Sequence, residues 1–268
     1  TFTYNINGAP NQFVTTLVGN SVTVAAPTNT VGTFTYNLVS VQEGSATTCS
    51  QAQAGSAIVT VNPLPTATIS GTTTVCQNSP SPLVTFTGAS ATAPYTFTYN
   101  INGAPNQFVT TLVGNSVTVA APTNALGIFT YNLVSVQEGS ATTCSQAQAG
   151  SAVITIDNLP VPALNGLNII CSGNSTVYTT DPGMGSYTWI VSAGGSITSG
   201  SGTPSITVMW NTAGPQTVSV NYVMGICSAA SPTVLPVTVK PRPSVTNAAN
   251  SSLCSNGTTN IFPAATLP

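Results

Sequence analysis

The chain has 268 residues, of which only 2% are charged, against roughly a quarter in an ordinary soluble domain. It contains two basic residues, four acidic residues and no histidine. This composition excludes a phosphate-binding surface for nucleic acid, and it leaves almost no side chain for general acid–base catalysis or for a nitrogen-ligated metal. We therefore expect no catalytic residue, no cofactor, no metal ion and no nucleic-acid partner.

Hydrophobic residues make up 41% of the chain, and they occur in short stretches such as Ile206–Trp210. No stretch reaches the ~20 apolar residues that a membrane-spanning helix needs, so we expect no membrane insertion. Thr, Ser, Asn and Gln take the place of charged residues at the surface. The composition predicts a folded, neutral, all-β chain.

The chain contains six cysteines and no Cys-X-X-Cys motif. Without histidine or clustered acids nearby, zinc binding is disfavoured and disulfide formation is favoured, which predicts an extracellular or cell-surface location. Thr1 falls in the middle of a strand pattern, so we expect this sequence to be a segment of a longer protein.

An internal duplication dominates the sequence. Residues 1–65 recur as residues 96–160, with 57 of the 65 positions identical. Most of the differences exchange one apolar or small residue for another, as at Ile58 and Val153. A period of 95 residues is too long for a solenoid repeat and is typical of one immunoglobulin-sized β-sandwich per unit.

Cysteines and prolines keep the same spacing through a third, divergent unit. One set of cysteines precedes a linker proline by 16 residues, and a second set follows that proline by 11; the triplets are Cys49-Pro65-Cys76, Cys144-Pro160-Cys171 and Cys227-Pro243-Cys254. Proline stiffens a junction and blocks strand pairing across it. The expected domains are 1–65 (the C-terminal part of an Ig-like module), 66–160 (a complete Ig-like module), 161–243 (a PKD-like or Ig-like module) and 244–268 (the N-terminal part of a further module).

Period-2 alternation predicts the strands of the second module. In chain order they are Leu83–Thr87, Tyr95–Ile101, Phe108–Val113, Val117–Ala120, Ile128–Val136 and Ala152–Ile156. The dipeptide Asn102-Gly103 suits a type I′ hairpin turn, and Tyr131 is expected on the core face of the longest strand. About seven strands per module, without helical periodicity, predict a Greek-key sandwich.

Three further strands are predicted in the third module, at Ser186–Val191, Ile206–Trp210 and Val218–Met224. Trp189 lies where sandwiches bury a core tryptophan, and Tyr222 shares the inner face of the last of these strands. We also expect Trp210 in the core; an exposed tryptophan would instead offer a surface that stacks on sugars.

Two stretches resemble a known class of repeats. The run YTWIVSAGGSITSGSGTPSITVMWNTAGPQTVSVNYVMGIC resembles the PKD-like and Ig-like repeats of Bacteroidota surface proteins. The run PTATISGTTTVCQNSPSPLVTFTGASATAPYTFTYNING resembles repeats in the giant gliding-motility adhesins of that phylum. The resemblance implies tandem Ig-like modules in an elongated array, export by the type IX secretion system and a place on the cell surface.

The four acidic residues do not form a catalytic arrangement. Glu43 and Glu138 are repeat equivalents in different modules, so they cannot act as a glycosidase pair, and we expect both to be solvated loop acids. Asp157 lies beside the Asn158-Leu-Pro160 linker, where an interdomain calcium ion is conceivable. Calcium usually requires several carboxylates, and the equivalent position in the first repeat is Asn62.

The disulfide connectivity has several alternatives. The leading interpretation closes each complete module on itself, through Cys76–Cys144 and Cys171–Cys227, while Cys49 and Cys254 pair outside the segment. However, Cys76 lies about where the first strand ends, and Cys144 lies in the last hairpin, at the opposite end of a standard sandwich. The alternatives are a Cys76–Cys227 bond across the junction and a Cys49–Cys76 bond.

Residues 1–65 carry later strands of a sandwich and residues 244–268 carry only an opening segment. Because a half-sandwich exposes apolar strands, we expect both ends to be completed, either by continuation of one chain or by strand donation from a like chain.

The leading functional hypothesis is a non-enzymatic, rigid, disulfide-stapled spacer in a long extracellular adhesin or filament. Its expected partners are neighbouring modules, like chains and surface glycans. The alternatives are a module that binds carbohydrate or protein through hairpin loops such as Gly103–Gln107, and an accessory region of a secreted enzyme.

Overall fold

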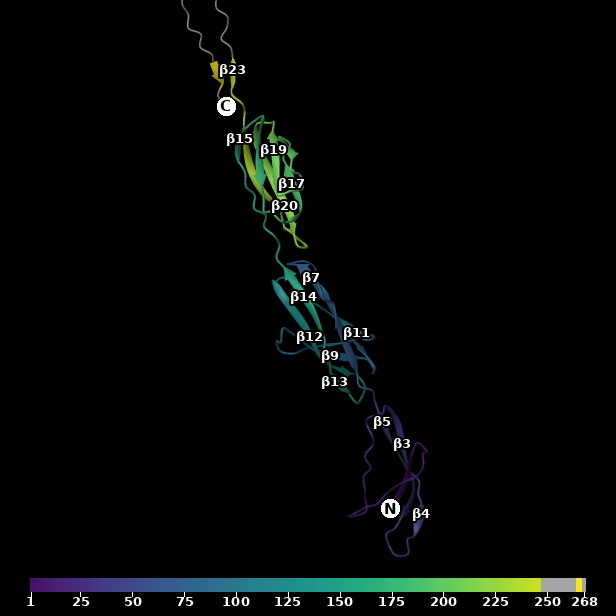
Figure 1. The fold of residues 1–268 in the computed structure, drawn as a ribbon. Helices are drawn as coiled ribbons and strands as arrows, with labels where there is room; N and C mark the ends of the chain where they lie inside the picture. The colour runs from purple at the N-terminus through teal and green to yellow at the C-terminus, as the bar shows by residue number, and fades with distance from the viewer. Residues whose placement is uncertain (247–263, 267–268) are drawn as a thin grey trace, which may run out of the picture. The chain divides into compact units, whose positions relative to one another are not determined.

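The computed structural model describes residues 1–246 and 264–266 (Figure 1). These residues form β-strands joined by turns and loops, with no helix among them, which confirms the predicted all-β class. They divide into two compact units. The first comprises residues 1–72, 82–121 and 129–154, and the second comprises residues 73–81, 122–128 and the described residues from 155 onward.

The first copy of the repeat forms a single antiparallel sheet. Its strands are β1 (Phe2–Ile6), β2 (Gln12–Val14), β3 (Gly32–Gln42), β4 (Ser50–Ala52) and β5 (Ser56–Val61), in the order β2-β1-β3-β4 with β5 also paired to β3. One face of this sheet borders an open hollow of about 530 Å³, lined largely by apolar side chains that include Phe2, Tyr4, Tyr36, Leu38 and Val59. This copy therefore has an uncovered apolar face.

The second copy forms a two-sheet sandwich together with residues 66–95. The larger sheet contains β7 (Thr73–Cys76), β9 (Tyr95–Ile101), β10 (Gln107–Thr110), β12 (Gly127–Glu138), β13 (Ser145–Ala147) and β14 (Ser151–Asp157), in the order β10-β9-β12-β14-β7 with β13 also paired to β12. The smaller sheet contains β6 (Thr66–Ser70), β8 (Leu83–Ala89) and β11 (Ser116–Ala120), in the order β11-β8-β6.

Aromatic side chains join these two sheets. Phe86 on β8 meets Phe97 and Tyr99 on β9, with ring centroids 5.6 and 5.0 Å apart. Tyr131 on β12 is buried and stacks on Tyr99 at 6.2 Å. Because the inner faces of both sheets supply large apolar rings, the core of this sandwich is dry and closely packed.

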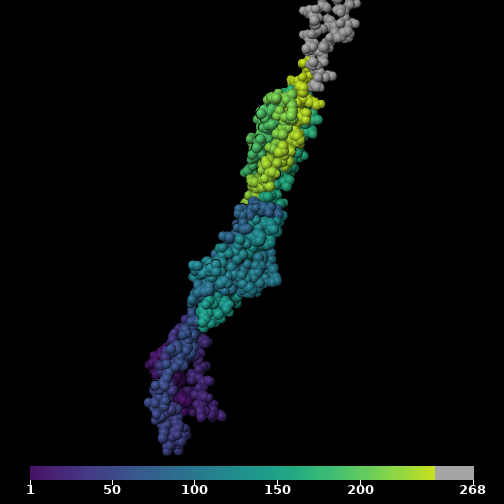
Figure 2. All heavy atoms as spheres, turned by 180° about the vertical axis from the view of Figure 1, so that it is seen from behind, coloured from purple at the N-terminus to yellow at the C-terminus, as the bar shows by residue number. Residues whose placement is uncertain are grey.

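The third module is a second sandwich. Its larger sheet contains β15 (Ile169–Cys171), β17 (Gly185–Val191), β20 (Gly214–Met224), β21 (Cys227–Ser228) and β22 (Thr233–Lys240), and its smaller sheet contains β16 (Asn174–Thr179), β18 (Gly195–Ser199) and β19 (Ser205–Trp210). β15 runs parallel to β22, so an early strand lies beside the last one. Segments distant in sequence thus share one surface, where green and yellow atoms adjoin in Figure 2.

Two tryptophans lie in the core of the third module. Trp210 is fully buried, and its Nε1–H donates to the hydroxyl of Tyr178 at 3.2 Å. Trp189 is 8% exposed and donates to the carbonyl of Thr203 at 2.9 Å. The short strands β23 (Ser244–Thr246) and β24 (Ala264–Thr266) pair with each other beyond this module.

One predicted strand ends earlier than expected. The stretch Phe108–Val113 was predicted as a strand, but β10 ends at Thr110, and Leu112 and Val113 lie almost fully exposed in the following turn. The partner strand β9 begins at Tyr95, and Thr111 makes the last hydrogen bonds to Tyr95. The ladder therefore stops where its partner begins.

The opening segment of the second module is divided into β6 and β7 at Gly71, which has a φ of 118°. A Cβ atom there would meet the backbone of Leu83 and Val84, so glycine permits this close turn. The turn allows β6 to pair in the smaller sheet while β7 pairs in the larger one. This switch places Cys76 beside the end of β14.

Candidate functional site: the Cys76–Cys227 disulfide and its surroundings

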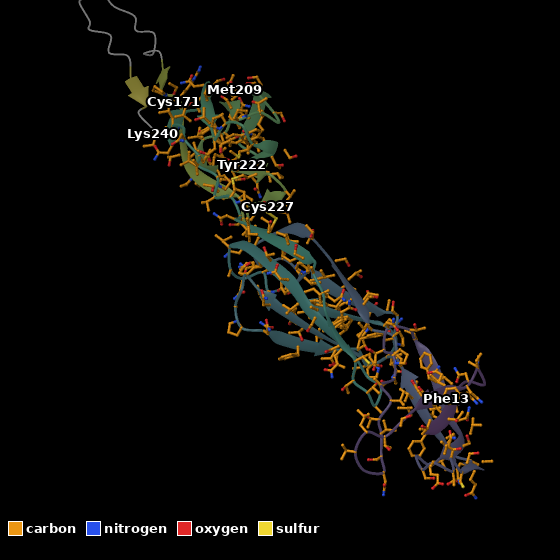
Figure 3. All side chains as sticks on the ribbon, turned by 60° about the horizontal axis from the view of Figure 1, so that its bottom comes forward. Phe13, Cys171, Met209, Tyr222, Cys227 and Lys240 are labelled. Atoms are coloured by element: carbon orange, nitrogen blue, oxygen red, sulfur yellow. A yellow bond between two sulfur atoms is a disulfide. The ribbon has the colours of Figure 1, made fainter. Side chains whose placement is uncertain are left out.

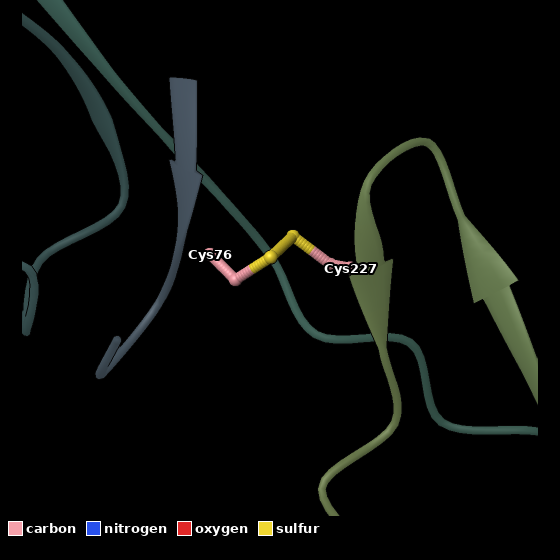
Figure 4. The surroundings of a disulfide bond; sticks show 2 residues. All are labelled: Cys76 and Cys227. Atoms are coloured by element: carbon pink, nitrogen blue, oxygen red, sulfur yellow. A yellow bond between two sulfur atoms is a disulfide. The ribbon is translucent and has the colours of Figure 1, made fainter. Parts of the chain in front are cut away.

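A disulfide bond joins the second and third predicted modules. Cys76 at the end of β7 is bonded to Cys227 at the start of β21, with their Cα atoms 5.5 Å apart (Figure 4). The two residues are 151 positions apart in sequence, and Cys227 is fully buried. The bond therefore connects two segments that are remote along the chain.

The expected pairing within each module is therefore wrong for Cys76–Cys144 and Cys171–Cys227, and the junction alternative is the one observed. The reason is the position of the loops. Cys171 is the register partner of Lys240, whereas Cys227 pairs with Met224 at the other end of β20. Figure 3 shows Cys171 and Lys240 together at one end of this module and Cys227 at the opposite end. A bond between Cys171 and Cys227 would have to span the length of the sandwich.

Among the described residues, Cys49, Cys144 and Cys171 carry unbonded thiols. Cys49 is exposed, and the other two are partly exposed. The Cys49–Cys76 alternative is also absent from the structure, because Cys76 is already bonded. Cys254 lies outside the described residues.

Hydrogen bonds tie both sides of the linker that follows β14. On one side, the amide of Gln77 donates to the carbonyl of Asp157 at 2.9 Å. On the other side, Thr180 Oγ1 donates to the carbonyl of Ala163 and Thr233 Oγ1 donates to the carbonyl of Pro162, both at 2.6 Å. The linker is thus held by bonds of its own in addition to the disulfide.

Glu138 organises the hairpin that carries Cys144. Its carboxylate accepts the side-chain hydroxyl of Ser140, the amide of Ser140 at 3.0 Å and the amide of Cys144 at 3.1 Å. The Ser140 hydroxyl is the main cause that lowers the pKa of Glu138, although desolvation opposes it. The expectation of a solvated loop acid is wrong for Glu138, whose side chain is only 3% exposed because it closes its own loop.

Glu43 has the same role in the first copy but is exposed. Its carboxylate accepts the hydroxyl of Ser45 at 2.6 Å and the amide of Cys49 at 3.4 Å. The Ser45 hydroxyl is the first cause that lowers the pKa of Glu43. The identical stretch Glu-Gly-Ser-Ala-Thr-Thr-Cys in both copies was the signal for this loop: an acid followed by hydroxyl residues and a cysteine amide.

Asp181 is the acid at the start of the third module. One carboxylate oxygen accepts both the amide of Ala163 at 2.9 Å and the hydroxyl of Tyr222 at 2.8 Å. The Ala163 amide, followed by Tyr222, lowers the pKa of Asp181. Desolvation and then this hydrogen bond raise the pKa of Tyr222 to about 12. Tyr222, predicted as a core aromatic, is thus a buried ring whose hydroxyl helps to hold the linker through Asp181.

The structure offers little for chemistry on a substrate. Among the described ranges, no three His, Cys, Asp or Glu side chains lie close enough to hold a metal ion. Both tryptophans are buried, so neither presents a sugar-stacking face. In the part of the chain that the structure describes, no helix is both long and apolar enough to cross a bilayer.

These observations define the class: an all-β chain with Ig-like sandwich modules and an intermodule disulfide. Residues 158–237 match a family profile described as a PKD-like domain. This match covers the third predicted module and not the whole chain. A comparison with curated proteins found no match.

Three solved structures illustrate the fold similarity. A Ca²⁺-stabilized adhesin with which an Antarctic bacterium binds ice is 15% identical, with a TM-score of 0.45, and the match covers 78% of this chain and 57% of that one. A 1.5-MDa bacterial ice-binding adhesin is 14% identical, with a TM-score of 0.40 and coverages of 78% and 73%. Fibronectin(III)-like modules of Clostridium thermocellum CbhA are 14% identical, with a TM-score of 0.32 and coverages of 65% and 94%. The chain thus spans little more than half the length of the first of these proteins.

Proposed function

We propose that this chain is a non-enzymatic structural segment of a long extracellular adhesin or surface filament, in which its modules act as disulfide-stapled spacers. The observation that carries the proposal is the Cys76–Cys227 bond, which links two predicted modules that the backbone already joins. A covalent second connection limits how far neighbouring modules separate under load. Each sandwich adds roughly 35–45 Å of reach, from strands of ~10 residues at ~3.3 Å per residue plus loops.

The composition supports a spacer role. With 2% charged residues and no histidine, the surface has neither a long-range electrostatic field nor a group that titrates near neutral pH at an ordinary pKa. The near-identity of residues 1–65 and 96–160 favours copy number over distinct binding specificities. We further propose, from the resemblance of its repeats to gliding-motility adhesins, that the parent protein reaches the bacterial surface by type IX secretion.

Single-molecule force spectroscopy on the chain, pulled from its two ends, tests the spacer role. In the oxidised chain, the 151-residue separation between Cys76 and Cys227 is bridged, so those residues add nothing to the extension. Reduction should release about 500 Å of additional contour length, at ~3.5 Å per residue. The variant Cys76→Ser should show that full length without reductant. Equal extension of oxidised and reduced wild-type chains would refute the load-limiting role.

A second candidate function is a binding module, and one observation favours it. The turn after β10 exposes Leu112 and Val113 almost completely, and the first copy exposes the equivalent Leu17 and Val18 to the same degree. Repeated apolar tips are a feature of surfaces that contact a partner. A glycan array probed with wild-type chain and with Leu17→Ser/Leu112→Ser tests this function: glycan binding that the double variant loses would support it, and no binding would leave the spacer role alone.

A further inference from the structure

Cys171 occupies the same structural position in the third module as Cys76 does in the second. The residue after Cys76, Gln77, donates its amide to the carbonyl of Asp157 at 2.9 Å, and the residue after Cys171, Ser172, donates to the carbonyl of Lys240 at 2.8 Å. Asp157 and Lys240 each end the last strand of their module, three residues before the linker proline. Both cysteines therefore lie beside the exit of a module.

Cys49 and Cys144 occupy the position of Cys227. Each lies in the last hairpin of its module, before β4 and β13 respectively, as Cys227 lies at the start of β21. The hairpin is closed by the same hydrogen bond in both copies, from the amide of Glu43 or Glu138 to the carbonyl of the cysteine, at 3.0 Å. Cys49 and Cys144 are thus hairpin-type thiols, whereas Cys76 and Cys171 are exit-type thiols.

A separate contact shows that the hairpin of Cys144 faces a module exit. Asn62 donates from Nδ2 to Oγ1 of Thr142, two residues from Cys144, at 2.7 Å. Asn62 is the repeat equivalent of Asp157, the residue that holds the exit segment of Cys76. The hairpin of Cys144 therefore contacts the position beside which an exit-type cysteine lies in the second module.

We propose that Cys171 is one half of a further intermodule disulfide, whose other half is the hairpin-type cysteine of a module placed directly after Pro243, supplied by a second copy of this chain as Cys49. Cys144 takes, by the same rule, the exit-type cysteine of the module before it. Each bond then joins the exit of one module to the last hairpin of the next. The bonds overlap along the chain, because Cys171 precedes Cys227, so no junction is held by the backbone alone. This inference rests on the proposed function only in taking the modules to be tandem.

The bond forms by thiol–disulfide exchange with a low-molecular-weight disulfide as the oxidant. The thiolate of Cys171 attacks one sulfur of that disulfide, which forms a mixed disulfide and expels one thiolate. The thiolate of Cys49 then attacks the sulfur of Cys171 and expels the second thiolate. The two protein thiols are oxidised by two electrons, the oxidant is reduced to two thiols, and the two protons pass from the protein thiols to those products.

The test is a tandem of two full copies, joined through the sequence Ala-Thr-Ala-Pro-Tyr of residues 91–95, which restores the 95-residue period across the joint. The first copy carries Cys49→Ser and the second carries Cys171→Ser, so one Cys171 and one Cys49 remain, on either side of the joint. A matched control carries Cys171→Ser in the first copy and Cys49→Ser in the second, which leaves the same two thiols at the far ends of the tandem.

Both tandems are oxidised with oxidised glutathione at low concentration, and the monomeric fraction is mapped by mass spectrometry after chymotrypsin digestion. The expected result is a Cys171–Cys49 peptide and loss of both thiols to alkylation in the first tandem, with both thiols still alkylated in the control. A free Cys171 in the first tandem, while Cys76–Cys227 has formed in each copy, would overturn the proposal. The same peptide in both tandems would overturn it too, as would a missing Cys76–Cys227 bond, because the pairing rule would then have no basis.

Discussion

Removing the Cys76–Cys227 bond should destabilise the third module, and the size of the effect follows from the loop that the bond closes. When residues 161–243 unfold while the second module stays folded, the bond ties Cys227 back to the module that ends at the linker. The tethered loop runs from Asn158 to Cys227, a separation of 69 residues. The chain-entropy model gives about 4 kcal/mol for such a loop, and native disulfides typically contribute about 2–4 kcal/mol.

Tryptophan fluorescence isolates this effect. The chain has two tryptophans, Trp189 and Trp210, and both are in the core of the third module. Urea unfolding of the full chain, followed by their emission, therefore reports on residues 161–243. A domain of this size has an m-value near the low end of about 1–3 kcal/mol/M, so the midpoint of Cys76→Ser/Cys227→Ser should fall by about 2 M.

The matched control is Cys49→Ser/Cys171→Ser, which makes the same two chemical changes at unbonded thiols. Its midpoint should stay at that of the wild-type chain. Reductant should lower the midpoint of the control and leave the bond-less variant unchanged. If the bond-less variant and the control unfold at the same urea concentration, the bond does not stabilise the third module and the loop-closure reasoning fails.

Three further predictions follow from individual contacts. Because its pKa is lowered on folding, ionised Glu138 stabilises its hairpin above the unfolded-state pKa, and this stabilisation is lost as the pH falls through the folded-state value; the thermal midpoint of Glu138→Gln should therefore converge on wild type in acid, and a constant difference at all pH values would contradict this. The raised pKa of Tyr222, to about 12, predicts stabilisation that is complete below pH 10 and lost as the pH rises toward 12; Tyr222→Phe should cost about 1–2 kcal/mol at pH 7 and lack this alkaline loss in urea titrations. A synthetic peptide of residues 66–95 should cover the open face of the first sheet and slow amide exchange in residues 21–25, whereas a Phe86→Ser peptide should not; equal exchange with both peptides would count against the match.

Strand positions were predictable from the sequence where one face of a strand is buried. The segment Tyr95–Ile101 has the predicted bounds, because alternating aromatic residues and threonines match one inner and one outer face. Phe108–Val113 was overextended because its apolar residues continue past the end of the partner strand. Local pattern therefore locates a strand, and the partner decides where it stops.

The disulfide pairing depended on information that spacing does not contain. The constant spacing between cysteines and linker prolines indicated junctions of controlled length, but it fitted bonds within or between modules equally well. The pairing follows from which end of a sandwich each loop occupies, and this depends on non-local partners such as Lys240 for Cys171 and Met224 for Cys227. The burial of Glu138 was hidden for the same reason, because a short loop rather than a charge pattern encloses it.

The duplication separates local from non-local causes within one chain. The residues Ser-Val-Thr-Val-Ala occur at 116–120, where they form β11, and again at 21–25, where they form no strand. The only difference that bears on pairing is β8, whose residues Leu83–Thr87 hydrogen-bond with β11 in the second copy. The same residues also bring Phe86 onto the rings of Phe97 and Tyr99, whose first-copy equivalents line the open hollow. An intrinsic preference for extended backbone is therefore insufficient here: this segment becomes a strand when a neighbour supplies both the ladder and the apolar cover.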